Sequence, residues 1–168
     1  KRMPLATAPK DAYRPAAGVV IFNQDGRVWL GERKGEKSAY RWQFPQGGID
    51  SGEKPKQAAF RELQEETGLK AKHVKLLGQL DEWLYYDFPP EFSGRKAMKG
   101  WRGQRQKWYA VQLVASESKI DLAAHKTVEF SSWKWGRLHE APELIIPFKR
   151  KVYERLAIEF AGYANPVK

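Results

Sequence analysis

The chain of 168 residues contains no cysteine, which excludes disulfide bridges, thiolate zinc sites and cysteine nucleophiles. Its longest run of apolar and small residues, Ala16–Phe22, is far shorter than the roughly 20 residues that span a bilayer. Residues 1–15 carry no apolar segment typical of a secretory leader, so we expect a cytoplasmic protein with no membrane partner. The three histidines, His73, His125 and His139, show no metal-ligand spacing.

Basic residues outnumber acidic ones. The chain has 30 lysines and arginines and 20 aspartates and glutamates, a net charge of +10, which favours a polyanionic partner such as nucleic acid or phosphates. With 42% hydrophobic and 13% aromatic residues, a chain of this length can bury one compact core. We therefore expect a flexible arm over residues 1–13 and a single domain over residues 14–163.

The hydrophobic pattern predicts strands interleaved with two helices. Strands are expected at Ala16–Asn23, Val28–Arg33, Trp42–Phe44, Val74–Trp83, Lys107–Val114 and Phe130–Trp135. Helices are expected at Lys54–Thr67 and Pro147–Phe160, and loops at Gln46–Gly52 and Phe88–Gln106. Asp25-Gly26 predicts a hairpin turn, and Gly68 suits the left-handed end of the first helix. This order predicts an α/β or α+β domain with a mixed sheet.

The first predicted helix carries three carboxylates on one face. Glu62, Glu65 and Glu66 stand at positions i, i+3 and i+4, so their like charges repel one another. A divalent cation between them would make the arrangement favourable, and oxygen ligands favour Mg²⁺ or Mn²⁺. Arg61 stands beside this face and could form a bidentate pair with Glu53. The alternative is a solvated acidic helix face, because glutamate is a good helix former.

A longer pattern of fixed residues surrounds these carboxylates. It consists of Gly47, Glu53, Arg61, Glu62, Leu63, Glu65, Glu66, Gly68 and Leu69. Together they meet every fixed position of the Nudix box, and nine matches at fixed spacing are highly specific. The segment therefore resembles the Nudix hydrolases.

The resemblance implies an α/β/α sandwich with a mixed central sheet, and a Mg²⁺-dependent hydrolase of nucleoside diphosphates linked to another group. It implies that Glu62, Glu65 and Glu66 bind the metal and that the backbone carbonyl of Gly47 adds a ligand. Glu53 and Arg61 would complete the catalytic set by stabilising the loop and helix geometry, and a role of Glu53 nearer the chemistry is the alternative. Mn²⁺ could substitute for Mg²⁺ at the same oxygen ligands.

The resemblance extends outside the box to one subgroup. The matching segments are Tyr13–Pro15, Trp42–Gly48, Gly103–Trp108, Glu129–Phe130 and Pro147–Arg150. They resemble the bacterial RNA pyrophosphohydrolases, alphaproteobacterial ones most, and equally the dinucleoside polyphosphate hydrolases. The first activity removes pyrophosphate from 5′-triphosphorylated RNA, leaving a 5′-monophosphate. The second cleaves diadenosine tetraphosphate into ATP and AMP. A third alternative is a binding module without catalysis, which the intact glutamates disfavour.

Further site residues follow from the same subgroup. Glu129 matches a distant glutamate that binds metal or activates water there. The predicted substrate-binding residues are Arg14, Arg33, Gln104, Gln106, Lys107, Phe148 and Lys149. Phe148 resembles a residue that stacks on a nucleobase, and its alternative role is helix packing. The acid-free basic segment Arg95–Lys107 is either a solvated loop or a track for an RNA backbone or second nucleoside. The sequence does not identify a protein activator.

Overall fold

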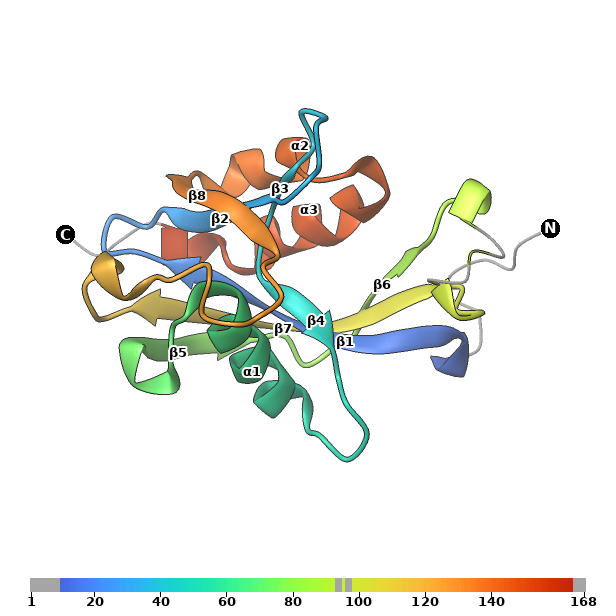
Figure 1. Cartoon of the computed structure of the whole chain (residues 1–168), viewed down its shortest axis with the longest axis horizontal. Helices are drawn as coiled ribbons and strands as arrows, with labels where there is room; N and C mark the ends of the chain where they lie inside the picture. The colour runs from blue at the N-terminus through green and yellow to red at the C-terminus, as the bar shows by residue number, and fades with distance from the viewer. Residues whose placement is uncertain (1–9, 93–94, 96–97, 165–168) are drawn as a thin grey trace.

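The computed structural model describes residues 10–92, 95 and 98–164 (Figure 1). Within them the strands are β1 (Tyr13–Phe22), β2 (Val28–Arg33), β3 (Trp42–Gln43), β4 (Gln46–Gly48), β5 (Val74–Gln79), β6 (Leu84–Asp87), β7 (Gly103–Leu113) and β8 (Phe130–Gly136). The α-helices in the same residues are α1 (Pro55–Thr67), α2 (Ala141–Leu144) and α3 (Arg150–Glu159). None of the helices described has the length and apolar character needed to cross a membrane.

All of these strands belong to one mixed sheet. β1 pairs in parallel with β7 along its whole length, whereas the other pairings are antiparallel. The order is β3-β2-β1-β7-β5, with β4 paired to β1, β6 to β7 and β8 to β2. In the view of Figure 1, α1 lies below the sheet while α2 and α3 lie above it. The predicted α/β class with a mixed sheet is therefore confirmed.

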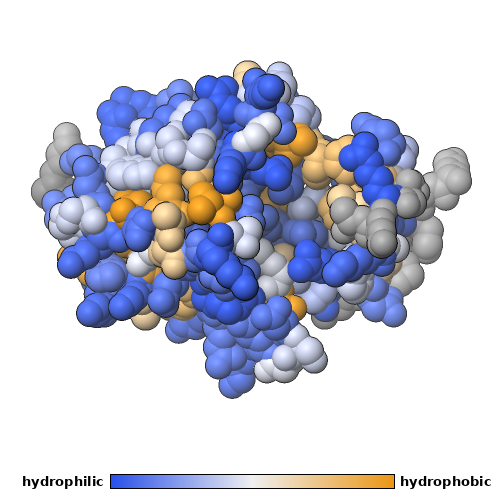
Figure 2. Space-filling model, in the orientation of Figure 1, coloured by the Kyte–Doolittle hydropathy of each residue, from blue (hydrophilic) through white to orange (hydrophobic). Residues whose placement is uncertain are grey.

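The central strand β1 is buried on both faces, because helices cover both sides of the sheet. Successive side chains of a strand point to opposite faces. Val19 accordingly joins the apolar cluster that contains Leu63 of α1, and Val20 joins the cluster that contains Leu156 of α3. Outside these two cores, the face of the molecule shown in Figure 2 is mostly hydrophilic, with two hydrophobic patches.

Two local predictions are confirmed by the backbone. The turn after β1 is a hairpin in which the Asn23 N–H donates to the Arg27 carbonyl at 2.9 Å. α1 begins at Pro55, whose missing N–H costs nothing in a first turn. It ends at Gly68, which has the left-handed φ of 78° and donates its N–H to the Gln64 carbonyl.

Other predicted boundaries are wrong. The predicted strand Val74–Trp83 ends at Gln79 as β5, and a separate strand, β6, begins just after the predicted range, at Leu84. β7 pairs with β5 through its second half and with β6 through its first half. The first three residues of the predicted loop Gln46–Gly52 form β4. Its glutamine and two glycines show no hydrophobic strand pattern. β7 starts at Gly103, inside the predicted loop Phe88–Gln106, because its pairing with β1 and β6 continues through polar residues that show no strand-like hydrophobic pattern.

The first strand and the last helix also start at other residues than predicted. Residues 1–9 of the predicted arm lie outside the described residues, but Tyr13 is the fully buried first residue of β1. Its hydroxyl donates to Asp87 at 2.6 Å, which attaches the start of β1 to the end of β6. At the other end, Pro147–Lys149 form a 3₁₀ turn, and the α-helix starts only at Arg150.

Candidate active site

β4 and α1 are in contact where the backbone of Gly47 lies against the Glu62 carboxylate. β4 pairs with β1, with Gly47 opposite Ala17. A β-carbon on Gly47 would collide with the Glu62 carboxyl group, and one on Gly48 would collide with the Arg14 guanidinium. The absence of β-carbons on Gly47 and Gly48 therefore lets an acidic and a basic group approach β4 from different elements.

Arg61 joins the loop before α1 to the acidic face of that helix. Its Nε and Nη2 donate to the two Glu53 oxygens at 2.8 and 2.9 Å, and Nη2 also donates to the Gly48 carbonyl at 2.8 Å. Its Nη1 donates to Glu62 at 2.7 Å and to Glu65 at 3.2 Å. The paired charges raise the pKa of Arg61 and lower that of Glu53. Arg61 and Glu53 thus position the loop against the helix carboxylates.

Glu66 is the most deeply buried carboxylate of the face, with 4% of its surface exposed. Burial raises its pKa well above 4.5, the neighbouring Glu62 and Glu129 carboxylates raise it further, and the Gln46 backbone N–H opposes them. Among the described residues, Oε1 of Glu66 has no hydrogen-bond partner. A buried carboxylate oxygen without a donor is costly, and a bound cation would remove that cost. Glu66 therefore fits the role of a metal ligand.

Glu129 reaches the same place from a distant part of the chain. It directly precedes β8, whose first residue Phe130 pairs with Arg33 of β2. The Lys34 N–H donates to the Glu129 carbonyl at 2.9 Å. The sheet therefore brings a carboxylate and an arginine together above the acidic face of α1.

One cavity of about 300 Å³ collects these groups. It is lined by Arg14, Arg33, Gln43, Gln46, Gly47, Gly48, Glu62, Glu66, Gln104, Glu129 and Lys149. Three carboxylates and three cationic side chains thus face one space. Burial, followed by the charge of Arg33, lowers the pKa of Lys149 to about 8, while the charges of Glu66 and Glu129 oppose this. We call this space the acidic–basic cavity.

Comparison with known proteins agrees with this geometry. Residues 12–156 match the profile described as the NUDIX domain. The chain belongs to the Nudix family. Relatives include an RNA pyrophosphohydrolase of Caulobacter vibrioides, 54% identical over 91% of this chain and 88% of that protein. Another, from Azorhizobium caulinodans, carries the same name and is 47% identical over 91% of this chain and 95% of that protein. The predicted family and subgroup resemblance is confirmed.

Solved structures of more distant Nudix proteins share the fold. The E. coli dihydroneopterin triphosphate pyrophosphohydrolase has a TM-score of 0.65 at 24% identity, over 88% of this chain and 98% of that chain. A C. elegans Ap4A hydrolase has a TM-score of 0.59 at 20% identity, with the same coverage. At these identities the likeness concerns the α/β/α arrangement alone.

Sequence reasoning missed two glutamines of this Nudix cavity. Gln43 is 5% exposed, and within the described residues its Oε1 has no hydrogen-bond partner. Gln46 accepts a hydrogen bond from Gln106 at 3.3 Å, and Gln106 in turn bonds Gln104 at 3.0 Å. Both missed residues stand in the Trp42–Gly48 segment that carried the resemblance. Their place in that segment was the available signal.

Six predicted site residues do not line the Nudix cavity itself: Glu53, Arg61, Glu65, Gln106, Lys107 and Phe148. The first three are joined by the hydrogen bonds that Arg61 donates to Glu53 and Glu65. Gln106 contacts the cavity residues Gln46 and Gln104 through its side-chain amide. Phe148 packs its ring against Tyr86 and Phe92, with both centroids 5.6 Å away. Lys107 donates to the Asp81 carbonyl, on a different face of β7. The structure thus separates residues that touch the cavity from residues that support it.

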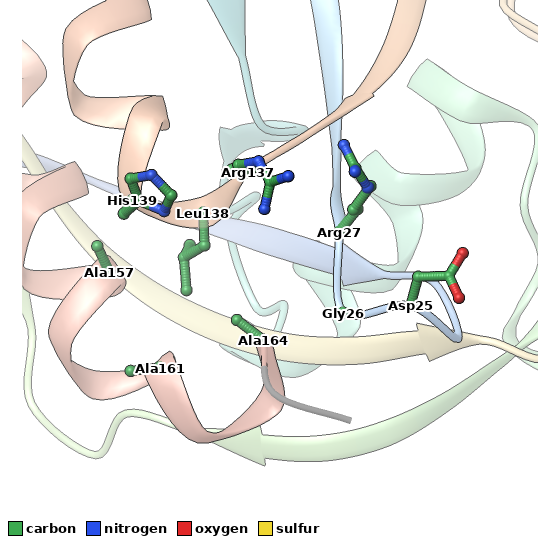
Figure 3. A pocket seen from close by; sticks show the side chains of 9 residues that line it. All are labelled: Asp25, Gly26, Arg27, Arg137, Leu138, His139, Ala157, Ala161 and Ala164. Atoms are coloured by element: carbon green, nitrogen blue, oxygen red, sulfur yellow. The ribbon is translucent and has the colours of Figure 1, made fainter. Parts of the chain in front are cut away.

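Two cavities elsewhere on the described surface are larger than the acidic–basic cavity. One of about 510 Å³ is lined by Arg27, Arg137, His139 and apolar groups at the far end of β1 (Figure 3). Another, of about 710 Å³, lies on the outer side of α1 and includes Glu65 and Arg61. Neither contains Glu62, Glu66 or Glu129. The cavity that brings the predicted carboxylates and cations together is therefore not the largest one.

Proposed function

We propose that this chain is an RNA pyrophosphohydrolase that removes pyrophosphate from 5′-triphosphorylated RNA and leaves a 5′-monophosphate. The observation that carries the proposal is the acidic–basic cavity, which offers oxygen ligands and phosphate-binding cations in one space. Relatives at 54% and 47% identity bear that name. Asymmetric cleavage of diadenosine tetraphosphate is the alternative that the sequence left open, and the same cavity chemistry would serve it.

The cations of the cavity are proposed to hold the polyphosphate. Arg14, Arg33 and Lys149 line it from β1, β2 and the turn before α3. Arginine forks bind phosphate oxygens in pairs, and lysine acts as a point charge. Gln104 lies on the same wall and can donate an amide hydrogen to a phosphate or base edge. Together they orient the phosphoanhydride bond towards the carboxylates.

The carboxylates are proposed to hold Mg²⁺, for which Mn²⁺ could substitute. Glu62, Glu66 and Glu129, with the carbonyl of Gly47 and with Glu65 at the edge, supply the hard oxygen ligands that such ions prefer. When bound there, the ion would neutralise phosphate oxygens and lower the pKa of water. In the described residues no three acidic or histidine side chains already stand in a geometry for a metal. Arg61 bonds Glu62 and Glu65, so binding would share or replace those hydrogen bonds.

The overall reaction adds water across a phosphoanhydride bond. The water oxygen bonds to phosphorus as the bridging P–O bond breaks, and pyrophosphate leaves with the electrons of that bond. One of the cavity carboxylates accepts the water proton. Glu53 and Arg61 are positioning residues, because their contacts fix the loop and not the reacting atoms.

The test is a side-by-side measurement of kcat/KM on triphosphorylated RNA and on diadenosine tetraphosphate in Mg²⁺. We expect higher kcat/KM on RNA, and loss of turnover in Glu66→Gln, whose carboxylate is buried in the cavity. The matched control is Glu154→Gln, an exposed residue of α3 outside the cavity. A strong preference for the free dinucleotide would reject the RNA assignment. Turnover that survives Glu66→Gln would reject the carboxylate assignment.

A further inference from the structure

A series of hydrogen bonds runs along one face of β7 into the acidic–basic cavity. The Trp108 indole N–H donates to Oε1 of Gln106 at 3.1 Å. Nε2 of Gln106 then donates to Oε1 of Gln104 at 3.0 Å and to Oε1 of Gln46 at 3.3 Å. Trp108 and Gln106 are buried, and Gln46 and Gln104 line the cavity. We call these four side chains the glutamine relay, because they connect the core with the cavity wall.

The indole group fixes the direction of the relay, because it can donate a hydrogen bond but cannot accept one. The Gln106 atom that faces Trp108 must therefore be the amide oxygen. The NH2 group of Gln106 is then directed at Gln46 and Gln104, with one acceptor for each of its hydrogens. Turning this amide over would set N–H against N–H and oxygen against oxygen, and would break three hydrogen bonds in a buried place.

The same rule decides what the two outer glutamines offer a ligand. The oxygens of Gln46 and Gln104 accept from Gln106, so the NH2 group is the part of each amide that is left to contact a ligand in the cavity. Arg14 stands opposite Gln104 in the β1–β7 ladder and lines the same cavity. Two amides and one guanidinium thus present donors, which suit phosphate oxygens because these only accept.

The position of Trp108 is set by the residues packed around its ring. A β-carbon on Gly18 of β1 would collide with the indole, so the ring occupies the space that this glycine leaves. Phe44 and Tyr153 pack edge to face against it, with centroids 6.0 and 6.1 Å away. The core, and not the ligand, therefore determines which way the relay points.

We propose that Trp108 and Gln106 are positioning residues that fix Gln46 and Gln104 as hydrogen-bond donors for phosphate oxygens. The proposal rests on the proposed function for the presence of a polyphosphate, and it adds Gln46 to the residues that bind it. Without the indole donor, the two orientations of the Gln106 amide would keep equal numbers of hydrogen bonds to the other glutamines. The NH2 groups of Gln46 and Gln104 would then face the cavity for only part of the time.

The kinetic test reverses the relay. Gln106→Glu leaves a carboxylate that only accepts, so Gln46 and Gln104 must turn their NH2 groups to it and their oxygens to the cavity. We expect kcat/KM to fall at least about tenfold, on triphosphorylated RNA or diadenosine tetraphosphate, whichever the wild type hydrolyses. In the background Gln46→Met/Gln104→Met the same substitution should cost less than about threefold, because no amide is left to reverse.

A charge control accompanies this comparison. Gln112→Glu adds the same charge to a half-buried residue of β7 outside the cavity and should leave kcat/KM unchanged. Equal losses for Gln106→Glu in the two backgrounds would show an effect of charge alone and would overturn the proposal.

A binding test follows the side-chain amides by NMR and needs no turnover. Inorganic pyrophosphate with Mg²⁺ is added to isotope-labelled wild type. The NH2 signals of Gln46 and Gln104 should shift, whereas that of Gln112 should not. Trp108→Phe should lower the affinity for pyrophosphate at least about twofold, because an orientation that is populated half of the time binds correspondingly more weakly.

Trp29→Phe is the matched control for this variant. Trp29 is also fully buried, but its indole N–H has no hydrogen-bond partner among the described residues, so its loss should leave the affinity unchanged. Equal losses in the two tryptophan variants would overturn the proposal. So would unshifted NH2 signals of Gln46 and Gln104 while backbone signals of the cavity move. The expected shifts in a wild type that does not hydrolyse triphosphorylated RNA would reject the proposed function alone.

Discussion

Replacing Glu66 by glutamine should make the metal-free protein more stable while abolishing its activity. Glu66 is 4% exposed, its Oε1 lacks a partner among the described residues, and the acidic groups of Glu62 and Glu129 lie near. Glutamine has nearly the same shape, carries no charge and can donate its amide hydrogen to a neighbouring carboxylate. The substitution removes the cost of burying a carboxylate charge beside two others, on the order of 1–3 kcal/mol, so the variant should be more stable by about that amount.

The assay is thermal unfolding with a chelator and with Mg²⁺. For a chain of this size, about 1–3 kcal/mol corresponds to a rise in Tm of about 2–12 °C in the chelator. Mg²⁺ at about 100 times its Kd should stabilise the wild type by about 2.7 kcal/mol, and most of that gain should vanish in Glu66→Gln. The Tm advantage of Glu66→Gln over the wild type should therefore shrink or change sign when Mg²⁺ is added.

A second substitution in the same box provides the control. Glu65 is 30% exposed and accepts a hydrogen bond from Arg61, so Glu65→Gln weakens a favourable ion pair. In the chelator it should lower Tm slightly, a change opposite in sign to that of Glu66→Gln. If Glu66→Gln is the less stable variant without metal, or keeps the full Mg²⁺ response, the account of Glu66 as a buried metal ligand is refuted.

Three further substitutions test ion pairs and a close backbone contact in and near the acidic–basic cavity. Arg61→Lys should lower the free energy of unfolding by about 2–4 kcal/mol in urea, because it breaks the bidentate pair with Glu53. Gly47→Ala should lower kcat at least about tenfold with little change in Tm, because its β-carbon displaces the mobile end of Glu62. Glu32→Gln should lower Tm near pH 7, and the deficit should vanish as the pH falls through the lowered pKa of Glu32. The folded protein lowers the pKa of Glu32 below 4.5, chiefly through the hydrogen bond from Arg41, so that stabilisation is present above pH 4.5 and is lost as pH falls.

The helix of the Nudix box and its acidic face could be predicted from the sequence because both depend on residues close together in the chain. Pro55 and Gly68 mark the ends of α1, and helical spacing alone puts Glu62 and Glu66 on one face. The positions of the other cavity residues depend on the tertiary fold. Arg14 and Glu129, for example, are far apart in the chain, and the β1–β4 and β2–β8 pairings bring them to one cavity. Their placement in the prediction came from resemblance and not from spacing.

The β6–β7 region shows why the remaining predictions failed. The first residues of β7, 103–107, are glycine and polar side chains on both faces, and a pattern without one apolar face is typical of a loop. Gln104 and Gln106 face the catalytic side, whereas Arg105 and Lys107 lie on the other side against Trp83. The alternation of period two is present, but it alternates glutamine with cation instead of apolar with polar. A strand that carries polar side chains on both faces therefore lacks the hydrophobic signal by which strands are recognised.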